Sequence, residues 1–127
     1  MVRTFALATA AFALAGCAQM ASMTGAAPVK SADGVFVNAD GMTLYTFDKD
    51  VAGSGKSVCN GPCATNWPPL MAASGASGSG DWSIIVRDDG GSQWAYKGKP
   101  LYRWIKDQKP GDRTGDGFNN VWRLARP

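Results

Sequence analysis

The 127-residue chain contains no histidine and no glutamate, and only three of its residues are cysteine. The absence of histidine excludes Ser-His-Asp and Cys-His catalytic arrangements, the usual zinc sites and the C-x-x-C-H attachment of c-type haem. The absence of glutamate removes the bidentate twelfth ligand of an EF-hand calcium loop. The sequence therefore favours a protein that is not an enzyme and that carries no cofactor.

Long apolar runs are also missing, apart from one near the N-terminus. Residues 1–16 have the form of a signal peptide, in which Arg3 supplies the positive charge and residues 5–14 supply the apolar stretch. That stretch is too short to span a bilayer as a helix. We therefore expect an exported protein, for which ATP and nucleic acid are not expected partners.

The end of the signal region, Leu14-Ala15-Gly16-Cys17, resembles the bacterial lipobox. In proteins with this motif the cysteine thiol is acylated and becomes the first residue of the mature chain. We expect Cys17 to attach the protein to a membrane, because more than one acyl chain gives stable anchoring. Ala18 replaces the aspartate that resembles an inner-membrane retention signal, which favours the outer membrane and a domain facing the periplasm.

The mature chain is weakly basic, and its basic residues are unevenly placed. Without Arg3 it holds 13 − 1 = 12 basic and 10 acidic residues, a formal net charge of +2. Basic residues outnumber acidic ones after residue 96, where they are Lys97, Lys99, Arg103, Lys106, Lys109, Arg113, Arg123 and Arg126. We expect a solvated face there rather than attraction to anionic lipid or polysaccharide.

Composition divides the mature chain into a tether and one domain. Residues 17–33 are mainly Ala, Ser, Met and Gly, which predicts a flexible tether. Residues 34–127 are enough for one domain, and they contain β-prone runs without a convincing helical period. We predict strands at 35–38, 42–47, 82–87, 93–96, 100–104 and 121–124, with a helical turn within 61–67.

The pattern Y-x-[FW]-x-x-D occurs twice in this domain. The two copies align at one offset, because 98 − 41 and 107 − 50 both give 57. In each copy two β-prone runs flank a glycine turn, at 40–41 and at 97–98, which predicts one hairpin per copy. We therefore expect an all-β single domain of two related hairpin units with long loops. The expected repeat halves are about 34–70 and 82–126.

The motif residues are Tyr45, Phe47 and Asp50 in the first copy and Tyr102, Trp104 and Asp107 in the second. Residues two apart in a strand share a face, so the tyrosine and the aromatic residue of each copy should point the same way. Each aspartate lies beyond its strand, where it can accept hydrogen bonds from turn amides such as those of Gly53 or Gly111. This structural interpretation of the motif needs no ligand.

On these residues the chain resembles the bacterial lipoprotein family with a repeated Y-x-(F/W/Y)-x-x-D motif, the secreted repeat of unknown function. The resemblance extends over 34–126 and includes the segments 57–64 and 67–70 between the two motifs. It implies an exported envelope protein, but it brings no settled activity.

Cys59 and Cys63 are the only cysteines left once Cys17 is acylated. An exported pair four residues apart predicts a disulfide in an oxidising compartment. Such a short loop should stabilise the fold by about 2 kcal/mol or less. The alternative is a redox-active pair, although the spacing is not the C-x-x-C of thioredoxin.

Two other patterns resemble ligand sites. Residues 53–57 imitate the end of a phosphate-binding P-loop, but the required first glycine is Asp50, so ATP binding is not expected. Asp112, Asp116 and Asn119 are weak calcium candidates, because Arg123 stands where the EF-hand needs glutamate.

Taken together, these features predict a lipid-anchored cell-envelope lipoprotein, most simply a non-enzymatic binding or structural module for an envelope component or small ligand. A thiol/disulfide redox or electron-transfer accessory that uses the cysteine pair is the alternative. A calcium-dependent binding module is the weaker one.

Overall fold

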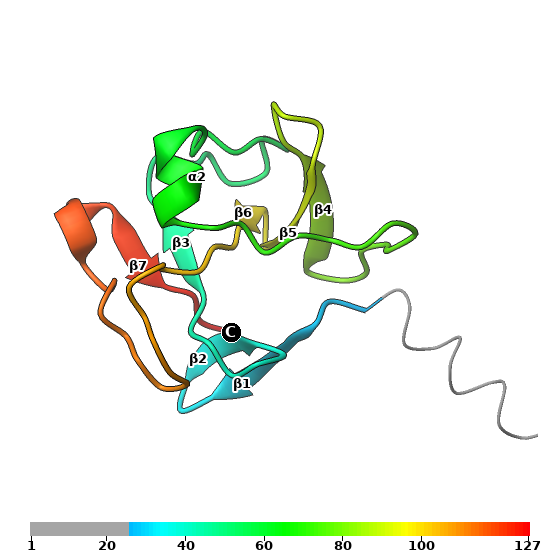
Figure 1. Cartoon of the computed structure of the whole chain (residues 1–127). Helices are drawn as coiled ribbons and strands as arrows, with labels where there is room; N and C mark the ends of the chain where they lie inside the picture. Colours follow the sequence, from blue (N-terminus) through cyan, green and yellow to red (C-terminus); the bar gives the residue numbers. More distant parts are fainter. Residues whose placement is uncertain (1–25) are drawn as a thin grey trace, which may run out of the picture.

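The computed structural model describes residues 26–127, which form an all-β fold with one short α-helix (Figure 1). Three small antiparallel sheets are formed by β1 with β2, by β3 with β7, and by β4, β5 and β6. The elements are β1 (Val29–Ala32), β2 (Val35–Asn38), β3 (Tyr45–Phe47), α2 (Pro62–Asn66), β4 (Trp82–Val86), β5 (Ser92–Tyr96), β6 (Lys99–Pro100), the 3-10 helix η1 (Phe118–Asn120) and β7 (Trp122–Leu124). The predicted all-β class with two related units is confirmed. The signal region and Cys17 lie outside the described residues.

The folded part begins earlier than the expected boundary at residue 34. Strand β1 pairs with β2 along its whole length, from Val29 opposite Asn38 to Ala32 opposite Val35. The two strands turn at Asp33 (φ 50°) and Gly34 (φ 80°), the positive angles that a two-residue type I′ hairpin loop requires. The predicted tether therefore includes a strand, because this Asp-Gly pair is itself a hairpin turn.

The predicted hairpin at residues 40–41 is looser than expected. The Asn38 side chain accepts hydrogen bonds from the amides of Asp40 and Met42, at 2.9 and 3.0 Å. Pairing after this turn is limited to the bridge between Val37 and Thr43, and a regular strand starts only at Tyr45. The predicted strand at 42–47 is thus reduced to β3.

The predicted hairpin at 97–98 is present, as are strands near the predicted ranges 82–87 and 93–96, but the predicted strand at 100–104 is reduced to β6. Strands β4 and β5 pair over five residues, and the turn between them closes with the Arg87 amide 2.7 Å from the Gly91 carbonyl. Lys97 (φ 48°) and Gly98 (φ 81°) turn β5 into β6. Pro100 in β6 lies at a sheet edge, where a missing amide donor is tolerated.

The two repeat halves are joined at their motif tyrosines. Tyr45 and Tyr102 face each other as an antiparallel pair, with N···O distances of 2.8 and 2.9 Å. On its outer side each tyrosine pairs with the returning segment of the other half, Tyr45 with Leu124 and Tyr102 with Pro69. The halves are therefore related by a local two-fold axis, and each completes the sheet of the other.

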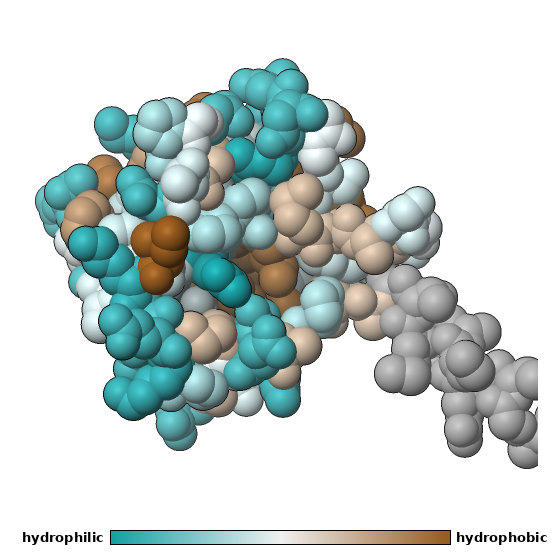
Figure 2. Space-filling view, viewed as in Figure 1, coloured by the Kyte–Doolittle hydropathy of each residue, from teal (hydrophilic) through white to brown (hydrophobic). Residues whose placement is uncertain are grey.

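Two groups of buried side chains form the core. One contains Phe36, Leu44, Leu70, Trp94, Leu101 and Ala125, and the other contains Tyr45, Cys59, Trp67, Tyr102, Trp104 and Trp122. The second group is almost entirely aromatic, as a small β domain with few aliphatic residues requires. Figure 2 shows that apolar side chains on the visible face form small patches among hydrophilic ones.

Candidate functional site

The motif tyrosines and aspartates form two buried pairs that cross between the repeats. Tyr45 donates a hydrogen bond to Asp107 at 2.6 Å, and Tyr102 donates one to Asp50 at 2.5 Å. Both tyrosines are fully buried, and each aspartate is 7% exposed. The tyrosine of one motif is thus the partner of the aspartate of the other, 52 or 62 residues away in the sequence.

Each motif aspartate also fixes the loop that follows it. The Asp50 carboxylate accepts the Val58 amide at 2.8 Å, and Asp107 accepts the Thr114 amide at 3.0 Å and its hydroxyl at 2.6 Å. The predicted role of accepting loop amides is confirmed, but the partners are not Gly53 and Gly111. The Gly53 amide instead donates to the Gly98 carbonyl at 3.0 Å.

The electrostatics of these pairs keep both phenols protonated. Burial, reinforced by the hydrogen bond to an aspartate, raises the pKa of Tyr45 and of Tyr102 well above the usual range. Burial also raises the pKa of Asp50, against the lowering effect of its bonds to Tyr102 and Val58. The phenols therefore act as hydrogen-bond donors at neutral pH and are poor nucleophiles.

The third motif residue, the aromatic one, belongs to a stack of four rings. Phe47 stacks on Trp122 at 4.3 Å, Trp122 on Trp67 at 3.7 Å, and Trp67 on Trp104 at 4.0 Å between ring centroids. The order alternates between the halves, since Phe47 and Trp67 come from the first and Trp104 and Trp122 from the second. Every motif side chain thus contacts the opposite repeat.

Each motif tyrosine also makes an edge-to-face contact with one tryptophan of this stack. The Tyr45 ring meets Trp67 at 5.3 Å and 81°, and the Tyr102 ring meets Trp122 at 5.2 Å and 89°. These edge-to-face contacts favour aromatic rings of this size at the motif positions.

A buried arginine distinguishes the Asp50–Tyr102 pair from the Asp107–Tyr45 pair. Arg87 follows β4 and is 3% exposed; its guanidinium donates to Ser57 at 2.9 Å, Gln93 at 2.8 Å and the Cys59 carbonyl at 2.6 Å. Ser57 lies 2.6 Å from the Tyr102 hydroxyl, so Arg87 belongs to the same network as Asp50. Sequence reasoning missed this arginine, although Ile85, two residues earlier in β4, points inward and indicates the buried face.

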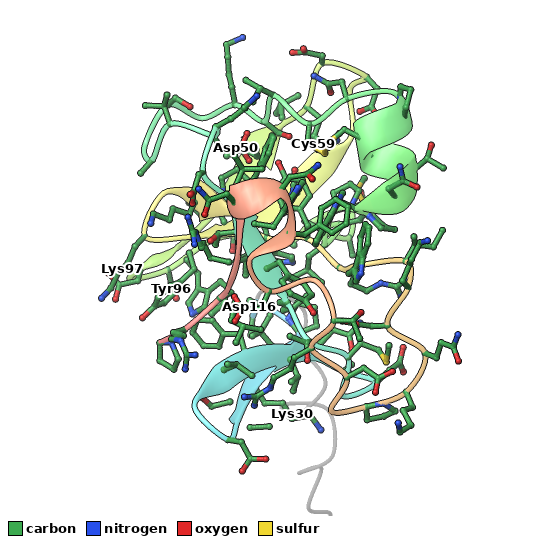
Figure 3. All side chains as sticks on the ribbon, turned by 90° about the vertical axis from the view of Figure 1, so that its left-hand side faces the viewer. Lys30, Asp50, Cys59, Tyr96, Lys97 and Asp116 are labelled. Atoms are coloured by element: carbon green, nitrogen blue, oxygen red, sulfur yellow. A yellow bond between two sulfur atoms is a disulfide. The ribbon has the colours of Figure 1, made fainter. Side chains whose placement is uncertain are left out.

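The predicted disulfide between Cys59 and Cys63 is present. Cys59 is fully buried in the aromatic core, whereas Cys63, in helix α2, is half-buried. Cys63 lines a cavity of about 330 Å³ together with Trp67 and Trp122. In Figure 3, Cys59 and Asp50 both lie in the upper part of the domain, in line with the bond from Asp50 to the Val58 amide.

Of the weak calcium candidates, Asp112 is engaged by its own loop. The Asp112 carboxylate accepts the amide of Gln108 at 2.9 Å and the Lys109 ammonium at 3.2 Å. Within residues 26–127, no three side chains of the His, Cys, Asp or Glu type lie together as metal ligands would. Asp116 and Asn119 are exposed, and Asn119 (φ 49°) lies in η1.

The P-loop-like segment 53–57 is used for folding. A Cβ atom on Gly98 would lie 2.4 Å from the Gly53 nitrogen, so the segment packs directly on the turn between β5 and β6. Ser57, the last residue of the segment, is buried in the Arg87 network.

Comparison with family models identifies the family. A family model described as a secreted repeat of unknown function matches the chain twice, over residues 27–71 and 83–126. The chain belongs to this family of secreted repeats. The search of curated proteins found no match, and neither did the search of solved structures. No helix in residues 26–127 has the length and apolar character needed to cross a membrane.

Proposed function

We propose that the protein is a lipid-anchored, non-enzymatic module of the bacterial cell envelope, held at the outer membrane through Cys17 with its domain facing the periplasm. Membership of a family of secreted repeats supports export. The sequence around Cys17 supports the anchor, because it resembles a lipobox directly behind a signal region.

The proposal that the protein is not an enzyme is supported by the structural role of the motif residues. Both motif tyrosines donate to buried aspartates, and each aspartate also accepts a loop amide. These groups are engaged with one another and lie inside the core, where a substrate would have to displace a structural hydrogen bond. The repeated motif is therefore best explained as the means by which two repeats form one domain.

The anchor is tested by growing cells with an alkyne-tagged palmitate and comparing the wild type with Cys17→Ser. Label on the wild type alone, together with membrane fractionation of the wild type, is the expected result. Equal labelling of both proteins, or a wild type found only in the soluble periplasmic fraction, would overturn the proposed anchor. Lys30→Gln serves as the matched control, because it changes an exposed residue outside the signal region.

One observation favours a second function, a redox accessory that uses the Cys59–Cys63 pair. Cys63 is half-buried and lines a cavity, whereas Cys59 is fully buried. Equilibration in thiol buffers with trapping of free thiols measures the reduction potential. A value below about −300 mV indicates a structural bond, whereas roughly −120 to −230 mV is the range of dedicated oxidoreductases.

A further inference from the structure

The net positive charge of the chain is concentrated at one groove. This groove, of about 280 Å³, is lined by Lys97, Lys99, Arg123 and Arg126 and by one acidic side chain, Asp48. The mature chain holds 13 − 1 = 12 basic and 10 acidic residues, so the rest of it holds 12 − 4 = 8 basic and 10 − 1 = 9 acidic residues. Outside the groove the mature chain therefore carries no excess of positive side-chain charge.

Two of these cations come from strands that neighbour β3. Arg123 of β7 lies opposite Thr46 of β3, and side chains in such a pair share a face of the sheet. Lys99 comes from β6, which contacts β3 from the other side. Thr46 lines the groove together with this arginine and this lysine.

The remaining two cations that line the groove are Lys97 and Arg126. Lys97 is held outward by the turn between β5 and β6, with its ammonium 5.5 Å from the centre of the Tyr96 ring. Figure 3 shows Tyr96 and Lys97 together at the edge of the domain, away from Asp50 and Cys59. Arg126 lies next to the β1–β2 turn, where it donates a long bond of 3.4 Å to the Gly34 carbonyl.

Little of this positive charge is neutralised inside the protein. Asp48 pairs with Arg123 at 3.1 Å, and both side chains are close to half exposed. Within residues 26–127, neither Lys97 nor Lys99 donates a hydrogen bond or forms a salt bridge through its ammonium. Four like charges that line one groove repel one another, and an anion bound among them would relieve that repulsion.

We propose that this groove binds a phosphate group carried on an organic body. A phosphate presents three oxygens that can bind several cationic donors at once, whereas a carboxylate has two, and arginine binds phosphate with a bidentate fork. Tyr96, Leu101 and Leu124 supply an apolar wall for the body of the ligand. The inference rests on the non-enzymatic envelope role proposed above and adds a ligand class to it; the phosphate belongs to a soluble phosphoester or to a lipid headgroup.

The experiment is an NMR titration of the mature, lipid-carrying protein in a non-ionic detergent, with inorganic phosphate and 4-nitrophenyl phosphate as probes. Shifts should be confined to residues of the groove, and the aryl ester should bind about threefold to tenfold more tightly than inorganic phosphate. Dihexanoyl phosphatidylglycerol, compared with dihexanoyl phosphatidylcholine, tests the headgroup source. Binding of the aryl ester without the phosphatidylglycerol identifies a soluble ligand, and the reverse result identifies a lipid.

Two variants change affinity in opposite directions. Lys97→Asn combined with Lys99→Gln should weaken binding by about tenfold, since charged hydrogen bonds are lost, and asparagine suits the positive φ at residue 97. Asp48→Asn should strengthen binding severalfold, because Arg123 then has no competing carboxylate. The control, Lys56→Gln with Lys106→Gln, removes the same charge from exposed positions outside the groove and should change affinity less than about twofold.

Any one of three results would refute phosphate binding at the groove. They are the absence of saturable shifts with either probe, equal weakening of binding by the groove and control variants, and unchanged affinity in Asp48→Asn. Melting curves of each variant confirm that the fold is intact. Release of 4-nitrophenolate is recorded in the same samples. Binding with turnover would refute the non-enzymatic proposal and leave the groove standing, whereas a lack of binding would refute the groove alone.

Discussion

Removing the hydroxyl of one motif tyrosine should markedly lower the melting temperature of the domain. In Tyr102→Phe the Asp50 carboxylate loses its 2.5 Å donor, and Ser57 loses its 2.6 Å partner. A hydrogen bond to a buried charged group contributes about 1.5–3 kcal/mol, and nothing in this closed core replaces it. We therefore expect a loss of about 2 kcal/mol in the free energy of unfolding, or roughly 8–16 °C in melting temperature for a domain of this size.

The third tyrosine provides a matched control. Tyr96 is half-buried, and its hydroxyl makes no hydrogen bond within the part of the chain that the structure describes. Tyr96→Phe should therefore cost less than about 0.5 kcal/mol. Urea unfolding followed by tryptophan fluorescence measures both variants under one set of conditions. The reasoning is wrong if the two phenylalanine variants lose equal stability.

Three further predictions follow from the same contacts. Burial raises the folded-state pKa of Asp50, so the protonated carboxyl contributes its full stabilisation below the unfolded pKa of about 3.9, and this is lost as pH rises through the folded value. The free energy of unfolding, measured against pH, should therefore fall less steeply toward neutrality in Asp50→Asn than in the wild type. Parallel curves for the two proteins would contradict this. Gly98→Ala should cost more than about 2 kcal/mol in chemical denaturation, because φ is 81° and the new Cβ lies 2.4 Å from the Gly53 nitrogen. A fragment of residues 26–71 alone should show no cooperative unfolding by circular dichroism, since its tyrosine and tryptophan partners lie in the other half; a sharp transition would refute the interlocked halves.

The local turns of this fold were readable from the sequence, whereas its long-range pairing was not. The turn at 97–98 is predicted because glycine next to a polar residue has a specific backbone requirement. The turn at Asp33 and Gly34 carries the same signal, but the weak β character of the preceding residues hid strand β1. Local chemistry thus predicts turns more readily than strand boundaries.

The crossing of the motif partners depends on the third dimension. The spacing of Tyr45 and Asp50 suggests that the two act together, yet Tyr45 bonds to Asp107 and Tyr102 bonds to Asp50. The repeat offset shows that two equivalent units exist, but it does not show how they associate. The antiparallel pairing of the two tyrosines creates the crossing, and no local pattern in the sequence encodes it.

Arg87 was missed for a different reason. A lone arginine at the end of a strand is usually solvated. Here the guanidinium is bonded to acceptors from two separate segments, Ser57 and Cys59 in one and Gln93 in the other. Only the folded chain brings these acceptors together.

The crossing itself is tested most directly by two double-mutant cycles that share Tyr45→Phe. One combines it with Asp107→Asn, the bonded partner in the other repeat, and the second with Asp50→Asn, the aspartate of its own motif. We predict a coupling free energy of about 1–2 kcal/mol in the first cycle and less than about 0.5 kcal/mol in the second. Strong coupling to Asp50 with none to Asp107 would show that each motif is a self-contained unit, and would contradict the interlocked domain.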